Sequence, residues 1–227
     1  MAHADDNLIL AQRLGEWISR APELEEDIAL GNIALDHLGV ARALYTRAGA
    51  LEEKGRGEDD LAMRRSEREF LNLLLVEQPN GDFAHTMVRG VLFDLYQVEL
   101  WADLSFAEDT TLAGIAARAL KEARYHVLHS SAWVIRLGDG TEESHRRAQT
   151  AVDNLWRYTA ELFEGPAQGY RDPWEKGVGE ILEEAHLRIP DDPYQRSGGR
   201  RGFHSEHLGP LLAEMQWLQR SHPGLEW

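Results

Sequence analysis

The chain of 227 residues contains no cysteine. Disulfide bonds, thiolate metal sites and cysteine nucleophiles are therefore excluded, and this absence fits a protein of the reducing cytoplasm. Basic residues are also scarce, because 24 Lys and Arg stand against 39 Asp and Glu and leave a net charge of −15. This balance argues against general binding to nucleic acid or to an anionic membrane, and it favours solubility.

Long apolar runs are absent as well. The longest ones, such as Leu73–Val76, are far too short to span a bilayer, and residues 1–6 lack the basic and apolar segments of a signal peptide. A phosphate-binding glycine loop, a nucleophile elbow and a dinucleotide fingerprint are also missing. We therefore expect a cytoplasmic protein without these nucleotide-binding or hydrolase motifs.

Apolar residues at helical spacing are what the sequence does contain. The 43% of hydrophobic and 28% of charged residues are typical of a globular protein with a substantial core. One continuous stripe comprises Leu30, Ile33, Ala34, His37, Leu38, Ala41, Leu44 and Tyr45; a second comprises Val91, Leu95, Val98 and Trp101; a third comprises Ile115, Ala119, Val127, Leu128 and Trp133. Strand-like alternation is hardly visible, so we predict an all-α protein.

Turn residues divide the chain between these stripes. The main breaks fall at Asn80–Gly81, Gly138–Thr141 and Gly165–Pro166 and in the irregular stretch 190–202, and Thr141 offers a helix cap. About six or seven helices are expected, from segments at roughly 5–20, 22–52, 61–76, 82–107, 110–138, 141–164, 173–188 and 204–221, with one kinked helix or two before Pro79. Internal repeats and linkers are not evident, so we predict a single domain over residues 1–227.

Three polar residues lie where the stripes predict apolar ones. His37 and Asp94 interrupt the first and second stripes, and His126 shares a helix face with Glu122 and His129. An unpaired carboxylate in a core is costly, so Asp94 needs a partner. Two interpretations stay open: a metal pocket or its remnant, and a hydrogen-bonded or ion-paired cluster such as Asp94 with His126 or an Arg. A lone histidine on an apolar face is more often structural.

Two further segments carry residues typical of binding sites. His204 and His207 lie one turn apart at a predicted helix start and could chelate a metal, but a surface or interface histidine pair is the more common outcome. Arg196, Arg200 and Arg201 lie among glycines and could hold a phosphate, although a solvated loop is the simpler interpretation.

Six strings of residues, in order along the chain, resemble one known family. They are Gln12–Trp17, Ala21–Glu25, Asn72–Gly81, Lys121–His126, Leu155–Phe163 and His207–Gln216. Together they cover essentially the whole chain, and the strings at 72–81 and 207–216 are long and specific. The chain resembles the phenylacetate-degradation family, and within it the smaller ferritin-like subunit (PaaC) of the ring-1,2-phenylacetyl-CoA epoxidase.

The resemblance implies an all-α fold with a ferritin-like four-helix-bundle core and additional C-terminal helices. It also implies a non-catalytic structural subunit of a monooxygenase complex that adds one oxygen atom of O₂ to the ring of phenylacetyl-CoA in aerobic phenylacetate catabolism. In such a complex a related catalytic subunit holds the di-iron centre, and a reductase with flavin and iron–sulfur groups supplies electrons from NADPH. This chain is then expected to bind no cofactor itself and to dock on the catalytic subunit and its accessory subunits, while a homodimer stays open.

The ligand positions of the catalytic relative can be placed on this chain. Its first-helix Glu falls near Asn7, its second-helix Glu-x-x-His on His37 and Val40, its third-helix acid on Asp94, and its fourth-helix Glu-x-x-His on Ala123 and His126. The resemblance therefore implies that only Asp94 and His126 match. We expect no catalytic residue and no bound metal, with His37, Asp94 and His126 as the remnants of a metal site.

These losses are physically consistent with one another. Clustered carboxylates without a metal repel one another and are costly to desolvate, so their replacement leaves a core that packs. Asp94 and His126 are then expected to satisfy each other, and the Arg196–Arg201 loop to help with the phosphates of CoA. The alternative is an independently active di-iron carboxylate oxygenase, in which Glu122 and Glu16 supply missing ligands by a shift of register. A free-standing binding or storage protein is a third candidate, favoured by the fold alone.

Overall fold

The computed structural model describes residues 1–191 and 194–224. This described part contains nine α-helices and no strand, so the predicted all-α, ferritin-like fold class is confirmed. The chain divides into two compact units, unit 1 with residues 1–79 and 198–227 and unit 2 with residues 80–197. The single domain expected over residues 1–227 stays a prediction. None of the helices in the described ranges has the length and apolar character that crossing a bilayer requires.

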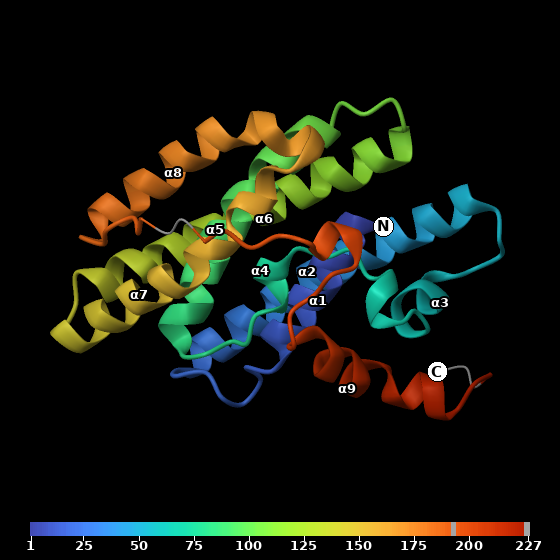
Figure 1. Cartoon of the computed structure of the whole chain (residues 1–227), viewed down its shortest axis with the longest axis horizontal. Helices are drawn as coiled ribbons and strands as arrows, with labels where there is room; N and C mark the ends of the chain where they lie inside the picture. Colours follow the sequence, from blue (N-terminus) through green and yellow to red (C-terminus); the bar gives the residue numbers. More distant parts are fainter. Residues whose placement is uncertain (192–193, 225–227) are drawn as a thin grey trace. The chain divides into compact units, whose positions relative to one another are not determined.

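Unit 1 is built on a helical hairpin, in which α1 (Ala2–Gly15) packs along α2 (Leu24–Glu52) (Figure 1). The remaining elements are α3 (Glu58–Met63), η1 (Glu67–Glu69), α4 (Leu74–Glu77), η5 (Gly199–Arg201) and α9 (Leu208–Ser221). Helix α3 packs on α2, α4 packs on α1, and α9 packs on α3 and η1. The stripe predicted for α2 is its buried face, since only Leu38 among the eight predicted residues is not buried.

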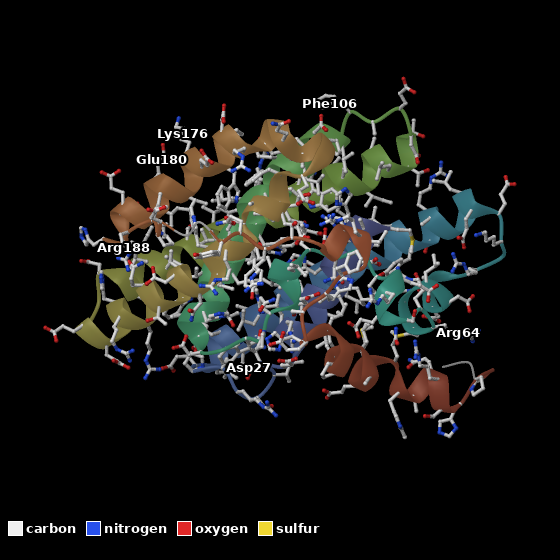
Figure 2. All side chains as sticks on the ribbon, in the orientation of Figure 1. Asp27, Arg64, Phe106, Lys176, Glu180 and Arg188 are labelled. Atoms are coloured by element: carbon white, nitrogen blue, oxygen red, sulfur yellow. The ribbon has the colours of Figure 1, made fainter. Side chains whose placement is uncertain are left out.

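Unit 2 is built on a second hairpin, α5 (Phe83–Leu104) and α6 (Thr110–Gly138), which lie side by side in Figure 1. It continues with α7 (Glu142–Leu155), three 3₁₀ turns, η2 (Trp156–Tyr158), η3 (Ala160–Phe163) and η4 (Gly165–Tyr170), and α8 (Arg171–Glu184). Helices α7 and α8 each pack on both α5 and α6. Figure 2 shows Lys176 and Glu180 on the outer side of α8 and Phe106 in the loop after α5, where it is 90% exposed.

Local capping explains where α5, α6 and α7 begin. The carboxylates of Asp82 and Asp109 accept hydrogen bonds from backbone N–H groups in the first turns of α5 and α6. The predicted cap at Thr141 is confirmed, because its hydroxyl oxygen accepts a hydrogen bond from the N–H of Ser144 at 3.1 Å. The bounds 110–138 predicted for α6 agree with the structure.

The segment predicted at 61–76, as one kinked helix or two, is helical only in part. This segment holds α3, η1 and α4 with extended backbone between them. The N–H of Leu71 donates to the carboxylate of Asp5 and the N–H of Leu73 to that of Asp6, each at 2.8 Å. Backbone donors that a helix would bond to its own carbonyls are therefore taken by side chains of α1. The helices predicted at 5–20 and 141–164 also end earlier, at Gly15 and Leu155.

The face predicted for α6 is wrong in part. Leu128 is 69% exposed, and the buried side chains are mostly small: Ala116, Ala119, Ala123, His126, Ser130 and Val134. Small residues let α5 and α6 approach closely. A Cβ atom on Gly90 of α5 would lie 3.0 Å from the Cβ of Ser130, so this position accepts no side chain without a shift. The close approach occurs next to the polar site of unit 2.

Candidate functional site

Unit 2 brings together Asp94 of α5 and His126 of α6. A carboxylate oxygen of Asp94 and a ring nitrogen of His126 lie within 4.8 Å of each other, and both residues are buried. Ala123, one turn before His126, is buried as well, so the position of the missing acid belongs to the core. Asp94 and His126 therefore lie close together in the core of unit 2. A direct hydrogen bond between them stays a prediction.

The environment of Asp94 favours its neutral form. Burial raises the pKa of Asp94 to about 8, although the Ser130 hydroxyl and the Arg89 guanidinium oppose this shift. The Ser130 oxygen lies 2.9 Å from the carbonyl oxygen of His126 and 3.2 Å from Oδ2 of Asp94. A hydroxyl has one hydrogen, so Ser130 donates to one of these two acceptors at a time. A neutral Asp94 needs no cation beside it.

In unit 1, His37 of α2 lies against Asn7 of α1. The Nδ1 atom of His37 is 2.8 Å from Oδ1 of Asn7, and the amide nitrogen of Asn7 donates to the carbonyl oxygen of His3 at 2.8 Å. Because an amide oxygen only accepts, Nδ1 of His37 carries the hydrogen. Val40, one turn further along α2, is buried. The three positions of unit 1 that were expected to match metal ligands thus hold a hydrogen-bonded amide and imidazole and one apolar side chain.

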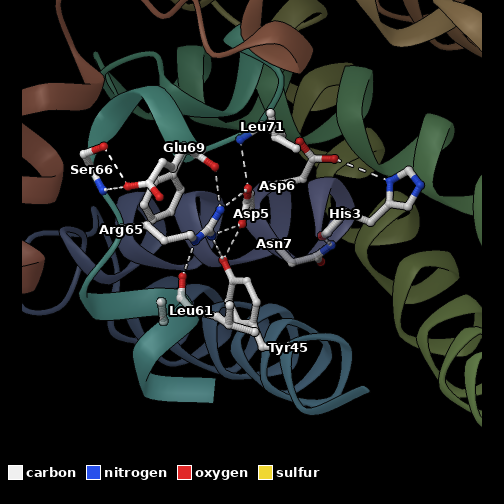
Figure 3. A network of polar contacts seen from close by, with 12 residues as sticks. His3, Asp5, Asp6, Asn7, Tyr45, Leu61, Arg65, Ser66, Glu69 and Leu71 are labelled. Atoms are coloured by element: carbon white, nitrogen blue, oxygen red, sulfur yellow. Dashed lines mark hydrogen bonds and ion pairs between the residues drawn. The ribbon is translucent and has the colours of Figure 1, made fainter. Parts of the chain in front are cut away.

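A larger polar cluster surrounds Asp5, which is fully buried in α1 (Figure 3). Its carboxylate accepts from the Tyr45 hydroxyl at 2.6 Å, from Nη1 of Arg65 at 3.1 Å and from the N–H of Leu71 at 2.8 Å, and Nη2 of Arg65 donates to it too. Burial and the neighbouring Asp5 raise the pKa of Tyr45 well above its ordinary value, so its phenol stays a donor. Arg65, itself buried, neutralises Asp5.

Asp6, the next residue of α1, pairs with Arg200. Two nitrogens of this guanidinium lie 3.0 and 2.7 Å from the two carboxylate oxygens, and Nη1 also donates to the carbonyl oxygen of Leu71 at 2.9 Å. Burial alone would raise the pKa of Asp6, but Arg200 and His3 outweigh it and lower the pKa. Arg200 is therefore neither a solvated loop residue nor an open phosphate ligand, whereas Arg196 and Arg201 are exposed.

The surface histidine pair expected at 204 and 207 is wrong for His204. Its ring is fully buried, with Nδ1 2.8 Å from the Glu77 carboxylate and Nε2 2.9 Å from the carbonyl oxygen of Phe70. Glu77, also buried, accepts from the N–H of Ser205 at 2.6 Å and from the Asn72 amide at 2.9 Å. Both ring nitrogens of His204 face acceptors, so neither is available to a metal.

Comparison with known proteins shows which protein family the whole chain resembles. The profile of a family described as phenylacetic acid catabolic protein matches residues 1–227. The chain belongs to this family. A relative from Escherichia coli (strain K12), the C subunit of 1,2-phenylacetyl-CoA epoxidase, is 49% identical over 237 residues, which cover 98% of this chain and 95% of the relative. The resemblance drawn from the six strings is therefore confirmed.

At the positions expected to match the ligands of a di-iron centre, this member of the phenylacetic acid catabolic protein family has few acidic side chains. Such centres in ferritin-like proteins take a Glu from each of two helices and a Glu-x-x-His pair from each of two others. At the corresponding positions unit 1 offers one imidazole, His37, and unit 2 offers one carboxyl and one imidazole. The two acids that could replace lost ligands each accept a hydrogen bond from an arginine one turn away, Glu122 from Arg118 and Glu16 from Arg13, each at 2.8 Å.

The ion pairs of unit 1 were missed from the sequence. Asp5 and Arg65 are 60 residues apart, and Asp6 and Arg200 are 194 apart, so no local pattern connects them. The only signal was two adjacent acids at the start of the apolar run Leu8–Leu10 of a predicted helix. In the structure each acid is neutralised by a guanidinium and holds backbone of the 71–73 segment. These clusters therefore hold the 71–73 segment against α1.

Proposed function

We propose that this chain is a non-catalytic structural subunit of a phenylacetyl-CoA 1,2-epoxidase complex, which docks on the catalytic di-iron subunit and supports it. Membership of the phenylacetic acid catabolic protein family supports a role in phenylacetate catabolism. The 49% identity to the C subunit of the E. coli epoxidase, over nearly the full length of both proteins, supports a place in such a complex.

The chemistry at the former ligand positions carries the non-catalytic part of the proposal. In unit 1 the Asn7 amide and the His37 imidazole are hydrogen-bonded to each other. In unit 2 Asp94 lies 3.2 Å from the Ser130 hydroxyl oxygen, and Ala123 fills the position of an acid with a methyl group. Polar groups satisfied in this way stabilise a core without a metal, whereas oxygen activation needs several anionic ligands around each iron.

Under this proposal the redox groups belong to other components. The catalytic subunit holds the two irons, and a reductase with flavin and iron–sulfur groups delivers electrons from NADPH. The residues of this chain supply packing: the ion pairs of Asp5 and Asp6 fix the 71–73 segment on α1, and the closely packed α5–α6 hairpin forms the centre of unit 2. A rigid helical partner keeps the catalytic subunit in its active shape.

Reconstitution tests the proposal. The chain is expected to co-purify with the catalytic subunit of its own organism, to show no epoxidation of phenylacetyl-CoA alone, and to raise the activity of that subunit in the presence of reductase and NADPH. Complexes that contain the Asp94→Asn or Asn7→Ala variant are expected to keep the wild-type epoxidation rate per mole of folded complex. Absence of any affinity between the two subunits contradicts the proposal.

Iron content decides between this function and the independent oxygenase. The purified chain is loaded anaerobically with ferrous iron, freed of excess metal and analysed. We expect iron near zero, because the chain lacks the carboxylates that a di-iron centre needs. About two irons per chain, lost on replacing Asp94 or His126 by Ala, would establish the alternative.

A further inference from the structure

An apolar groove runs along an exposed face of the α1–α2 hairpin in unit 1. Its volume is about 460 Å³. From α1 and the turn after it, the groove is lined by Leu8, Ala11, Gly15 and Ile18, which follow one another at intervals of three, four and three residues. Ile18 at the end of this row is 61% exposed. Leu8 and Ala11 are buried and form the floor of the groove, which is open at its Ile18 end.

The α2 side repeats the same spacing. Ile28, Gly31, Leu35 and Leu38 line the groove at intervals of three, four and three residues. Ile28 and Leu35 are 58% and 65% exposed, and Leu24, four residues earlier, is 72% exposed. Apart from Leu38, which lies at the edge of both, this row differs from the buried stripe of α2, so α2 has one apolar face packed within the chain and a second that is largely open.

The spacing indicates what fits the groove. Apolar residues alternating at intervals of three and four form the seam by which α-helices pack at a shallow angle, each side chain entering a gap between residues of the facing helix. Here two such seams lie on neighbouring helices and flank one groove. A third helix with its own apolar seam fits between them, in the helix-in-groove mode of recognition.

The two glycines that line the groove also favour a helix as its occupant. A Cβ atom on Gly15 or Gly31 would meet no atom of the described chain within 4 Å. Gly31 lies in the middle of α2, where alanine or leucine would stabilise the helix better than glycine. Since no neighbour within the described chain requires its small size, the bare backbone suits a close approach from outside.

Charge distinguishes two possible occupants of the groove, a second copy of this chain and a helix of another protein. Each chain carries a net charge of −15, and the segment that leads into the α2 row holds Glu23, Glu25, Glu26 and Asp27. A second copy in the groove would bring these acids toward another strongly acidic surface. A helix with basic residues beside its apolar seam complements this rim instead.

We propose that the groove between α1 and α2 receives an amphipathic helix of the catalytic subunit, with an apolar three–four seam flanked by basic residues. This inference rests on the function proposed above, because that function supplies the partner. It adds the docking surface and the chemistry of the element that binds there.

Charge insertion into the groove tests the proposal in the full-length chain. Ile28→Glu and Leu35→Glu are each expected to weaken binding of the purified catalytic subunit by about tenfold or more, because a carboxylate is desolvated in the seam. Both positions are exposed, so the melting temperature of the free chain should change little. The matched controls are Leu128→Glu and Phe106→Glu, which alter apolar residues of unit 2 that are at least as exposed. They should leave the affinity within about twofold.

A second pair of variants separates docking from folding. Gly31→Leu is expected to raise the melting temperature of the free chain by a few degrees, since leucine favours the helix and its Cβ meets no atom. It should nevertheless weaken binding by about tenfold, because the side chain fills the space of the partner helix. Gly114→Leu, at an exposed helical glycine of α6 that is equally open, should raise the melting temperature without changing the affinity.

The outcomes distinguish this inference from the proposed function. If the catalytic subunit binds the wild-type chain and the groove variants equally well, the groove assignment is overturned and the function stands. If the wild-type chain has no affinity for the catalytic subunit, both fall. If sedimentation shows a dimer of the free chain that Leu35→Glu converts to a monomer, the occupant is a second copy and the assignment is likewise overturned.

Discussion

His204 and Glu77 form a buried ion pair that ties the C-terminal segment of unit 1 to α4. The two ring nitrogens of His204 lie 2.8 Å from a Glu77 carboxylate oxygen and 2.9 Å from the carbonyl oxygen of Phe70. Both partners are acceptors, so both ring nitrogens carry hydrogens and the imidazole is a cation. Arg13 adds a second tie, because Nη2 of its guanidinium donates to the backbone carbonyl of Glu77 at 2.7 Å.

This pair predicts a stability that falls as the pH rises. Burial would lower the pKa of His204, but the hydrogen bonds to Glu77 and Phe70 outweigh it and raise the pKa above 6.5. The contribution is therefore complete below pH 6.5 and is lost as the pH rises through the higher pKa of the folded state. His204→Gln should lower the free energy of unfolding by about 1–3 kcal/mol at pH 6 and by less at pH 9.

Urea denaturation at several pH values between 5.5 and 9 measures this difference. The control is His186→Gln, because the His186 side chain is 70% exposed and should contribute little at any pH. A cost of His204→Gln that stays the same across the whole range would show that the ring is not charged in the folded chain.

Asp94 predicts a pH dependence of its own. Its pKa is about 8 in the folded chain, against an ordinary value of 3.8, so the folded state keeps a proton that the unfolded state releases. Stability thus falls as the pH rises from about 4 to 8. Asp94→Asn removes this pH dependence. The unfolding free energy of the variant minus that of the wild type should therefore rise by about 2 kcal/mol or more between pH 5 and 8. Parallel urea titrations with Asp59→Asn, at an exposed acid, provide the baseline.

The Asp5–Arg65 pair predicts a large loss on breaking it from one side. Asp5→Ala leaves the guanidinium of Arg65 buried without its carboxylate and should cost about 3–5 kcal/mol of unfolding free energy. Tyr45→Phe removes the hydrogen bond to Asp5 and the one that the Tyr45 oxygen accepts from Arg65, but it leaves the ion pair, so it should cost only about 1–2 kcal/mol. An exposed pair serves for comparison: Arg42→Ala, opposite Glu58, should cost at most about 1 kcal/mol. Equal losses for the buried and exposed pairs would contradict this account.

The close approach of α5 and α6 at Gly90 predicts an effect opposite in sign to helix propensity. Gly90→Ala should lower the unfolding free energy by about 1–3 kcal/mol, because its Cβ would lie 3.0 Å from that of Ser130. Gly114→Ala, at an open helical position, should instead raise it by about 0.5–1 kcal/mol. Adding Ser130→Gly to Gly90→Ala should recover part of the loss, which thermal denaturation of the four chains measures. A purely additive double variant would rule out the contact as the cause.

Local signals predicted the parts of the fold that depend on local contacts. The bounds of α6 followed from Gly138 at its end and from its apolar period, and the buried face of α2 followed from one continuous stripe. Asp94 and His126 were singled out because each interrupts a regular helical pattern. The structure places both on helices of unit 2 and brings their polar atoms within 4.8 Å.

Contacts between distant residues account for what the sequence did not predict. Apolar periodicity made residues 61–76 look helical, yet Asp5 and Asp6, more than 60 positions earlier, take their backbone donors. His204 looked like half of a surface pair because its partners, Glu77 and Phe70, lie about 130 residues away. Polar side chains that hold such segments leave no pattern in the sequence around them.

The order in which unit 1 and unit 2 become complete during synthesis follows from the Asp6–Arg200 pair. Unit 2 is a continuous stretch, 80–197, so all its residues have been synthesised before Arg200 is added. Unit 1 contains residues from both sides of unit 2 in the sequence. The Arg200 guanidinium that pairs with Asp6 is synthesised 194 residues after it. Domains fold as their residues emerge, so the growing chain can close unit 2 first. The first helix to be synthesised is then among the last to be locked in place.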